Sequence, residues 1–169
     1  SPQMNKIVFP AAILQEPFYY EGGDALSLAK SYGAIGVVIG HEITHGFDDS
    51  GRKYDHNGNL NNWWTEDDEK RFIEKTKKVV EQYSKCTFFD ENINGELTQG
   101  ENIADIVGVK ISYQAYKLAC KKIKSKEFFF SYANVWKNLI TEQAAKLRIQ
   151  TDPHSPGEIR VNQVLKNIK

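Results

Sequence analysis

The sequence predicts a single, mainly α-helical domain with a few short strands near its N-terminus. The chain has 169 residues, which is enough for one domain with its own core and too few to expect two. Apolar residues recur at spacings of three and four over long stretches, while Asp, Asn, Gly and Pro gather between them. The hydrophobic content of 40% and the charged content of 26% are those of an ordinary globular protein.

The N-terminal part is expected to form a short strand and then a long helix. Residues 7–9 read Ile-Val-Phe and precede Pro10, which predicts a strand that enters a turn, because proline cannot donate to a β-ladder. Apolar spacing from about residue 25 to residue 47 predicts a helix with a wide apolar face. Residues 48–64 are rich in Asp, Asn and Gly and are expected to form a loop.

Three more helices are expected in the rest of the chain. Thr65 precedes three acidic residues, which favours a capped start there and a helix to about residue 84. Thr98 precedes Glu101 by three positions, a capping-box spacing, and predicts a helix from about residue 99 to residue 123. Residues 128–147 show a fourth helical pattern, followed by a proline-containing loop at 152–157.

The charge balance excludes several classes of partner. Lys plus Arg and Asp plus Glu number 22 each, so neither nucleic acid nor an anionic membrane surface is an expected partner. The longest apolar stretch, residues 34–43, is far too short for a membrane span, and no direct membrane contact is expected from this segment. Cys86 and Cys120 are expected to be two unrelated thiols, since their spacing fits neither a disulfide scaffold nor a thiolate metal site.

His41, Glu42 and His45 form an H-E-x-x-H pattern in the middle of the first predicted helix. The two imidazoles lie on one helix face and can reach one ion. They suit Zn²⁺, which in catalytic sites takes a third protein ligand and keeps its fourth position for water. Glu42 would then be the general base toward that water as it attacks a carbonyl carbon. An accidental match of two structural histidines is the competing interpretation, against which the apolar helical setting weighs.

Glu101 is the expected third ligand. No histidine occurs at the metzincin spacing after His45, where residues 48 and 49 are aspartates, so the ligand must come from elsewhere. Glu101 lies in the first turn of the helix predicted from residue 99, and Asp105 follows one turn later on the same face. Asp105 is expected to orient a ligand histidine, His41 in preference, by accepting from its second ring N–H. An acidic helix start favoured by the dipole is the alternative.

Five stretches of the chain contain distinctive sequence motifs. They are residues 7–15, 38–49, 62–65, 100–105 and 152–156, with Arg160 after them. In their order and their residues these motifs resemble those of the neprilysin and endothelin-converting enzyme family of zinc metallopeptidases, and the resemblance extends over nearly the whole chain. The resemblance implies a thermolysin-like (gluzincin) catalytic subdomain. It also implies one Zn²⁺ per chain, with His41, His45 and Glu101 as ligands.

The same resemblance implies roles for further side chains. Glu42 would be the catalytic base and Asp105 the acid that holds a ligand histidine. His154 is similar to a family histidine that donates to the developing oxyanion, and Arg160 to an arginine that binds a substrate backbone carbonyl. Taken alone, both are ordinary surface residues. The residues similar to the lining of the family's apolar pocket, for which core packing is the alternative, are Ile13, Phe18, Tyr19, Val37, Val38 and Trp136.

Residues 1–169 are expected to be the C-terminal catalytic part of a longer protein, because family members have a large helical domain before this region and a further C-terminal stretch. The expected partners are oligopeptide substrates and the protein's own N-terminal domain. Animal members carry cysteines near Lys78 and Lys137, and this chain does not, which is more similar to the disulfide-free bacterial members. The cytoplasm, the cell envelope and an extracellular ectodomain all stay open.

The expected function is therefore that of a zinc metalloendopeptidase that cleaves short peptides on the amino side of bulky apolar residues. One rival is another zinc peptidase with a glutamate ligand, such as an aminopeptidase, for which the required amine-binding acid motif is not found. A second rival is a zinc-binding fragment without turnover of its own, because the substrate-clamping domain is missing.

Overall fold

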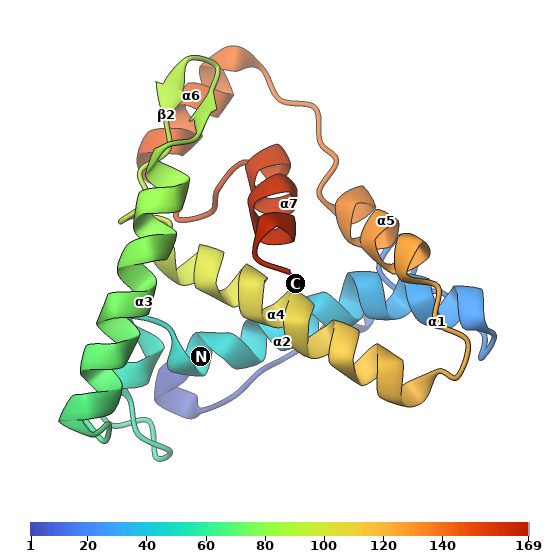
Figure 1. Cartoon of the computed structure of the whole chain (residues 1–169), viewed down its shortest axis with the longest axis horizontal. Helices are drawn as coiled ribbons and strands as arrows, with labels where there is room; N and C mark the ends of the chain where they lie inside the picture. The colour runs from blue at the N-terminus through green and yellow to red at the C-terminus, as the bar shows by residue number, and fades with distance from the viewer. Residues whose placement is uncertain (169) are drawn as a thin grey trace.

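The computed structural model describes residues 1–168, apart from the side chain of Pro2, and confirms a mainly helical domain (Figure 1). The α-helices are α1 (Ala25–Ser31), α2 (Val37–Thr44), α3 (Glu66–Ser84), α4 (Gln99–Ala119), α5 (Ser125–Val135), α6 (Glu142–Thr151) and α7 (Gly157–Lys166). Short helical turns are η1 (Pro2–Met4), η2 (Ala11–Ile13), the π-helical η3 (Tyr32–Gly36), η4 (His45–Phe47) and η5 (Gly51–Lys53). The strands β1 (Thr87–Phe88) and β2 (Glu91–Asn92) form an antiparallel hairpin.

The helix predicted at residues 25–47 is confirmed as one continuous helical run. It begins at Asp24, whose carboxylate accepts hydrogen bonds from the backbone N–H groups of Leu26 and Ser27. It then passes through α1, η3, α2 and η4 without leaving helical geometry. The apolar face that predicted this helix therefore also delivers the H-E-x-x-H pattern, in α2 and the start of η4, to the interior of the domain.

The packing of α2 against α4 sets the architecture, and the two helices run side by side through the middle of Figure 1. Their backbones meet at Gly40 and Gly108. A Cβ atom at Gly108 would lie 2.7 Å from the backbone nitrogen of His41, and one at Gly40 would lie 2.9 Å from the carbonyl oxygen of Gly108. Because neither glycine has a side chain, the helices approach closely enough for residues at the start of α4 to reach the imidazoles of α2.

The remaining helices enclose this pair. In Figure 1, α5 lies along α1 at one end of the molecule, and α7 packs against α4 near the centre. Helix α3 packs on α4, and the β1–β2 hairpin follows the C-terminal end of α3. Helix α6 packs against this hairpin. Between these elements lies one apolar core, whose largest fully buried side chains are Tyr83, Tyr116, Tyr132 and Phe128. This core fixes the positions of α4 and α7, the two later helices that supply site residues.

The predicted start of α3 is confirmed. The side chain of Thr65 accepts from the backbone N–H of Asp68 and donates to its carboxylate, and four acidic residues occupy the first turn. The loop predicted at residues 48–64 is also confirmed, with η5 and an isolated bridge between Tyr54 and Leu60 inside it. The buried Arg52 holds this loop on α3 through an ion pair with Glu69.

Two predictions near element ends were wrong. Residues 7–9 form no strand, because nothing in the described part of the chain pairs with them and its one sheet is the β1–β2 hairpin. Thr98 does stand at the start of α4, but it makes no capping box with Glu101. Its hydroxyl donates to the carbonyl of Asn94 and accepts from Asn102. The carboxylate of Glu101 is thereby left to face the histidines.

The single helix predicted at residues 128–147 was also wrong, since the chain leaves helical geometry between α5 and α6. Trp136 ends α5 with its ring against the guanidinium of Arg160, 3.7 Å from the ring centroid. Thr141 then caps α6 by accepting from the N–H of Ala144. Helix α4 ends at Ala119, before the expected residue 123, and α7 was not predicted at all.

We predict that Gly108→Ala will destabilise the domain, because the added methyl group would overlap the backbone of α2. The loss in free energy of unfolding should be about 2 kcal/mol, measured by chemical denaturation. Gly23→Ala is the matched control, since no atom lies within 4 Å of a Cβ at Gly23. A Gly108→Ala variant as stable as the control would show that the close approach of α2 and α4 has little energetic weight.

Candidate metal centre

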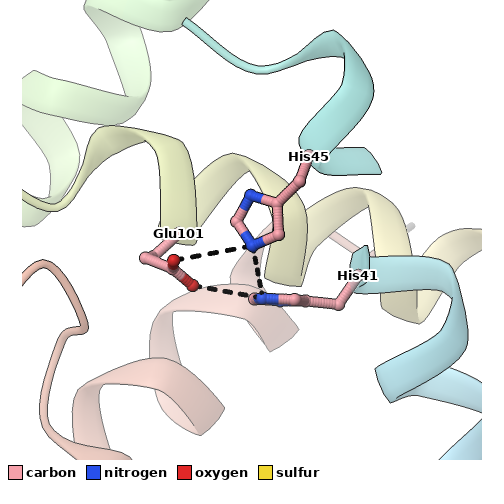
Figure 2. A group of neighbouring side chains, drawn as sticks. All are labelled: His41, His45 and Glu101. Carbon is pink, nitrogen blue, oxygen red and sulfur yellow. Dashed lines mark hydrogen bonds and ion pairs between the residues drawn. The ribbon is translucent and has the colours of Figure 1, made fainter. Parts of the chain in front are cut away.

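His41, His45 and Glu101 converge on one point between α2, η4 and α4 (Figure 2). The Nε2 atoms of the two imidazoles are 2.9 Å apart. The carboxylate of Glu101 completes the triangle, with Oε2 3.1 Å from His41 Nε2 and Oε1 3.5 Å from His45 Nε2. The structure therefore brings together the three side chains that the sequence predicted as metal ligands.

The outer nitrogens of both imidazoles are already engaged by carboxylates. His41 Nδ1 lies 2.8 Å from Asp105 Oδ1, and His45 Nδ1 lies 2.7 Å from Asp48 Oδ2. Because an ionised carboxylate only accepts, each Nδ1 must carry the proton, and each neutral ring then presents a lone pair on Nε2. Both imidazoles are thus held in the tautomer that a metal ligand requires.

Without a cation, the Nε2 lone pairs of the two neutral imidazoles and the carboxylate of Glu101 would repel one another. The pKa of His41, which burial alone would lower, is raised to about 9 by the adjacent carboxylates of Asp105 and Glu101. Burial opposes ionisation of Glu101 as well, but its contacts with His154 and His41 hold the pKa of Glu101 well below its usual range. The pocket therefore favours positive charge at the point where the three side chains meet.

The residues fit a tetrahedral ion such as Zn²⁺. Two ligand atoms bound to one such ion lie about 3.3 Å apart, and the three observed separations lie on either side of that length. Glu101 Oε2 is buried and makes no well-directed hydrogen bond to any described residue, although two imidazole nitrogens are near it. A metal ion held by the three side chains would satisfy this buried carboxylate oxygen.

Asp105 accepts a hydrogen bond from His41, and its negative charge is balanced by Arg160. Its side chain is 1% exposed, and Arg160 donates to it twice, from Nε to Oδ2 at 2.6 Å and from Nη2 to Oδ1 at 2.7 Å. Burial disfavours the ionised form, yet the Arg160 guanidinium and the bond with His41 keep the pKa of Asp105 below its usual value. The sequence predicted the contact of Asp105 with His41 but not the buried ion pair behind it.

Asp48 is the second supporting carboxylate, and the sequence reasoning passed over it. Its Oδ2 faces His45, while its Oδ1 accepts from the backbone N–H groups of Ser50 and Gly51. The sequence signal for it is an aspartate three residues after the second histidine, followed by Asp-Ser-Gly, a composition that favours a tight turn. Each of the two imidazoles thus has its own buried carboxylate.

Glu42 is not one of the three converging side chains, and it lines a groove on the surface. The groove has a volume of about 830 Å³ and lies between residues 1–8 and the chain around η4. Both Glu42 and His45 line it. A molecule in the groove would therefore lie beside the predicted base and one predicted ligand at the same time.

His154 and Arg160 lie on another side of the centre, next to a second hollow. His154 Nε2 is 3.1 Å from Glu101 Oε2, and Asp152 accepts from its Nδ1 and from its backbone N–H. The carboxylate of Glu101 beside Nε2 raises the pKa of His154 above its usual value. Both His154 and Arg160 line a cavity of about 320 Å³, together with Trp136.

The residues predicted to line an apolar pocket lie in different places in the structure. Trp136 lines the cavity beside His154 and Arg160, whereas Ile13, Phe18 and Val38 do not line it. These three are half-buried, and Phe18 accepts a backbone hydrogen bond from Ile35. Val37 belongs to the core, and Tyr19 is exposed.

Comparison with known proteins agrees with this geometry. The model of peptidase family M13 matches residues 1–169. The chain belongs to peptidase family M13. Neprilysin-1 of Caenorhabditis elegans is 47% identical over 184 residues, covering 99% of this chain and 24% of that protein. An endothelin-converting enzyme homolog of Locusta migratoria is 44% identical over 182 residues, covering 100% of this chain and 24% of that protein.

A solved structure of an M13-like enzyme has the same fold. The zinc metalloprotease Zmp1 of Mycobacterium tuberculosis, in complex with an inhibitor, superposes with a TM-score of 0.92 at 43% identity. That match covers 99% of this chain and 28% of the other. The chain therefore spans about a quarter of the length of the M13 relatives it matches. Within residues 1–168, no helix is both long and apolar enough to cross a bilayer, and both cysteines are free thiols.

We predict that Arg160→Met will cost about 3–5 kcal/mol of unfolding free energy, because it leaves the buried charge of Asp105 without its partner. Thermal and chemical unfolding followed by circular dichroism would measure the loss. Arg71→Met is the control: Arg71 forms an equally short pair with Asp68 at the surface, worth at most about 1 kcal/mol. Equal effects of the two substitutions would contradict this interpretation of Asp105.

Proposed function

We propose that this M13 chain is the catalytic part of a zinc-dependent endopeptidase that hydrolyses oligopeptides. The observation that carries the proposal is the convergence of His41, His45 and Glu101 with Glu42 at the edge of the same centre. Zn²⁺ held by these three ligands would supply Lewis acidity toward a peptide carbonyl and lower the pKa of the attacking water. The rest of the reaction is assigned to this chain's own residues.

Glu42 would take the proton of the attacking water. It lies on the open side of α2, in the groove lined also by His45, where a carboxylate can reach a water molecule beside the ion. The base could then deliver that proton to the leaving amine. Within the described residues, no side-chain hydrogen bond or ion pair engages the carboxylate of Glu42, so it is available for this transfer.

His154 would stabilise the negative charge that develops on the carbonyl oxygen. Asp152 holds its Nδ1–H, and the raised pKa of His154 favours the form in which Nε2 also donates. Arg160 would bind a substrate backbone carbonyl next to the scissile bond. Asp105 engages its Nε and Nη2, while its Nη1 forms no hydrogen bond within the described residues and remains open to a ligand.

The proposed specificity is for peptide bonds on the amino side of bulky apolar residues. The cavity that contains His154 and Arg160 has apolar walls from Phe88, Trp136 and Ile149. Its volume, about 320 Å³, is comparable to that of one large side chain with room around it. A residue that follows the cleaved bond would thus lie beside the groups that hold its backbone.

We also propose that this part packs against an N-terminal helical domain of the same protein. The M13 relatives are about four times longer than this chain. The N-terminal segment exposes Met4, Val8 and Leu14, which are 68%, 68% and 50% accessible to solvent. Apolar side chains in one such segment commonly mark a contact surface.

Glu101→Ala is predicted to abolish stoichiometric zinc binding. It removes the only carboxylate of the ligand set and leaves two imidazoles, which hold the ion far more weakly. Metal analysis after dialysis should give close to one zinc per wild-type chain and much less in the variant. Glu96→Ala, an exposed acid shortly before the same helix, is the control and should keep its zinc. Full zinc content in Glu101→Ala would refute the ligand assignment.

Glu42→Gln is predicted to keep zinc and lose turnover. Removing a general base lowers the rate by about 10²–10⁴-fold, whereas Glu42 is not in the ligand set. Hydrolysis of a fluorogenic oligopeptide with a bulky residue after the cleaved bond, by the product of the complete gene, would measure the loss. Glu81→Gln on the exposed face of α3 is the matched control. Wild-type rates in Glu42→Gln would remove the proposed base.

A further inference from the structure

We propose that Asp48 is the positioning residue for His45, and that the loop from Asp48 to Arg52 is a brace that fixes Asp48 from outside the metal centre. This inference rests on the proposed metal site. It concerns how the second histidine is held, which neither the motif nor the family match specifies. Asp48 lies just past η4, three residues after His45, at the point where the helical run ends.

A tight turn locks the carboxylate of Asp48. Its Oδ1 accepts from the backbone N–H of Ser50 at 2.9 Å and of Gly51 at 2.7 Å, and its carbonyl accepts from the N–H of Arg52 at 3.2 Å. With Oδ1 engaged twice by the main chain, Oδ2 alone points to His45 Nδ1, 2.7 Å away. Burial opposes ionisation, but the bonds from His45, Gly51 and Ser50 keep the pKa of Asp48 below its usual value.

Arg52 attaches the other end of this turn to α3. Its Nη2 donates to Glu69 Oε1 at 2.8 Å, and its guanidinium lies 5.7 Å from the ring centroid of Trp64 and 5.5 Å from that of Phe72. The side chain of Arg52 is 10% exposed, so this is a partly buried pair rather than a loose surface contact. The turn is thus fixed on both sides, to His45 and to a long helix.

The chemistry explains why a carboxylate is required at position 48. Only an acceptor opposite Nδ1 keeps the proton there and leaves Nε2 free to bind a metal. An amide nitrogen in the same place would donate instead, which favours the tautomer with the proton on Nε2, and that ring cannot ligate until it is reorganised. Asp48 and Asp105 would then perform the same task for two different imidazoles.

The test compares Asp48→Asn with Asp49→Asn. The first keeps the shape of the side chain and an oxygen for the turn but presents an amide to His45. The second changes a neighbouring, half-buried acid that contacts no histidine. Zinc affinity is measured by competition with a chromophoric chelator, and the absorption spectrum of the Co²⁺-substituted protein reports whether His45 ligates. Unfolding of the metal-free proteins is measured alongside.

We expect Asp48→Asn to bind zinc about 10- to 100-fold more weakly, with an altered Co²⁺ spectrum, while Asp49→Asn matches the wild type in both. Arg52→Met should shift the affinity in the same direction by a smaller factor. Wild-type affinity and spectrum in a folded Asp48→Asn protein would overturn the inference, as would a loss of metal-free stability alone. Should Asp48→Asn not fold, Asp48→Ser replaces it, because its hydroxyl can still accept from the turn but cannot reach His45.

Failure of this inference is distinguishable from failure of the proposed function. If the wild type binds no zinc, or Glu101→Ala binds it fully, the metal site itself is wrong. If the wild type binds zinc and depends on Glu101 while Asp48→Asn is indistinguishable from it, only the role of Asp48 is wrong.

Discussion

The close contact between the backbones of α2 and α4 is the constraint on which the site depends. A carboxylate at the start of one helix can meet two imidazoles on another only if the axes nearly touch, and Gly40 and Gly108 allow this. The same crossing brings Asp105, one turn after Glu101, beneath His41. This one helix contact therefore places a predicted ligand and its supporting carboxylate together, and buried tyrosines of the core pack around it.

Local patterns predicted much of this arrangement because the relevant information is local. Helical spacing located residues 25–47, and the four-residue separations of His41 from His45 and of Glu101 from Asp105 fix which side chains share a face. Whether those two helix faces meet depends on tertiary packing. Because Glu101 is far from the histidines along the chain, local patterns could not predict it. At the level of the sequence, only the resemblance to a known family indicated that Glu101 meets the two histidines. In the structure, the crossing of α2 and α4 brings them together.

The errors have the opposite character, since each arises where a distant contact overrides a local preference. Thr98 and Glu101 have the spacing of a capping box. However, the Thr98 hydroxyl accepts from Asn102, and the Glu101 carboxylate faces His41. The pattern at 128–147 is helical throughout, yet Trp136 packs on Arg160 and ends α5. Asp48 was overlooked because its role depends on a turn whose geometry is fixed by contacts with α3, which no short pattern records.

The charges around the centre explain why a divalent cation suits it. Three buried or half-buried carboxylates, those of Asp48, Glu101 and Asp105, surround two imidazoles that are neutral when they bind a metal, and Arg160 is the single cation among these groups. The set therefore carries two net negative charges, and burying them without compensation would be costly. A doubly charged ion between Glu101 and the histidines neutralises the set, whereas a proton on His41 compensates only half of it. The carboxylates that hold the rings thus also set the charge of the ion that the rings can hold.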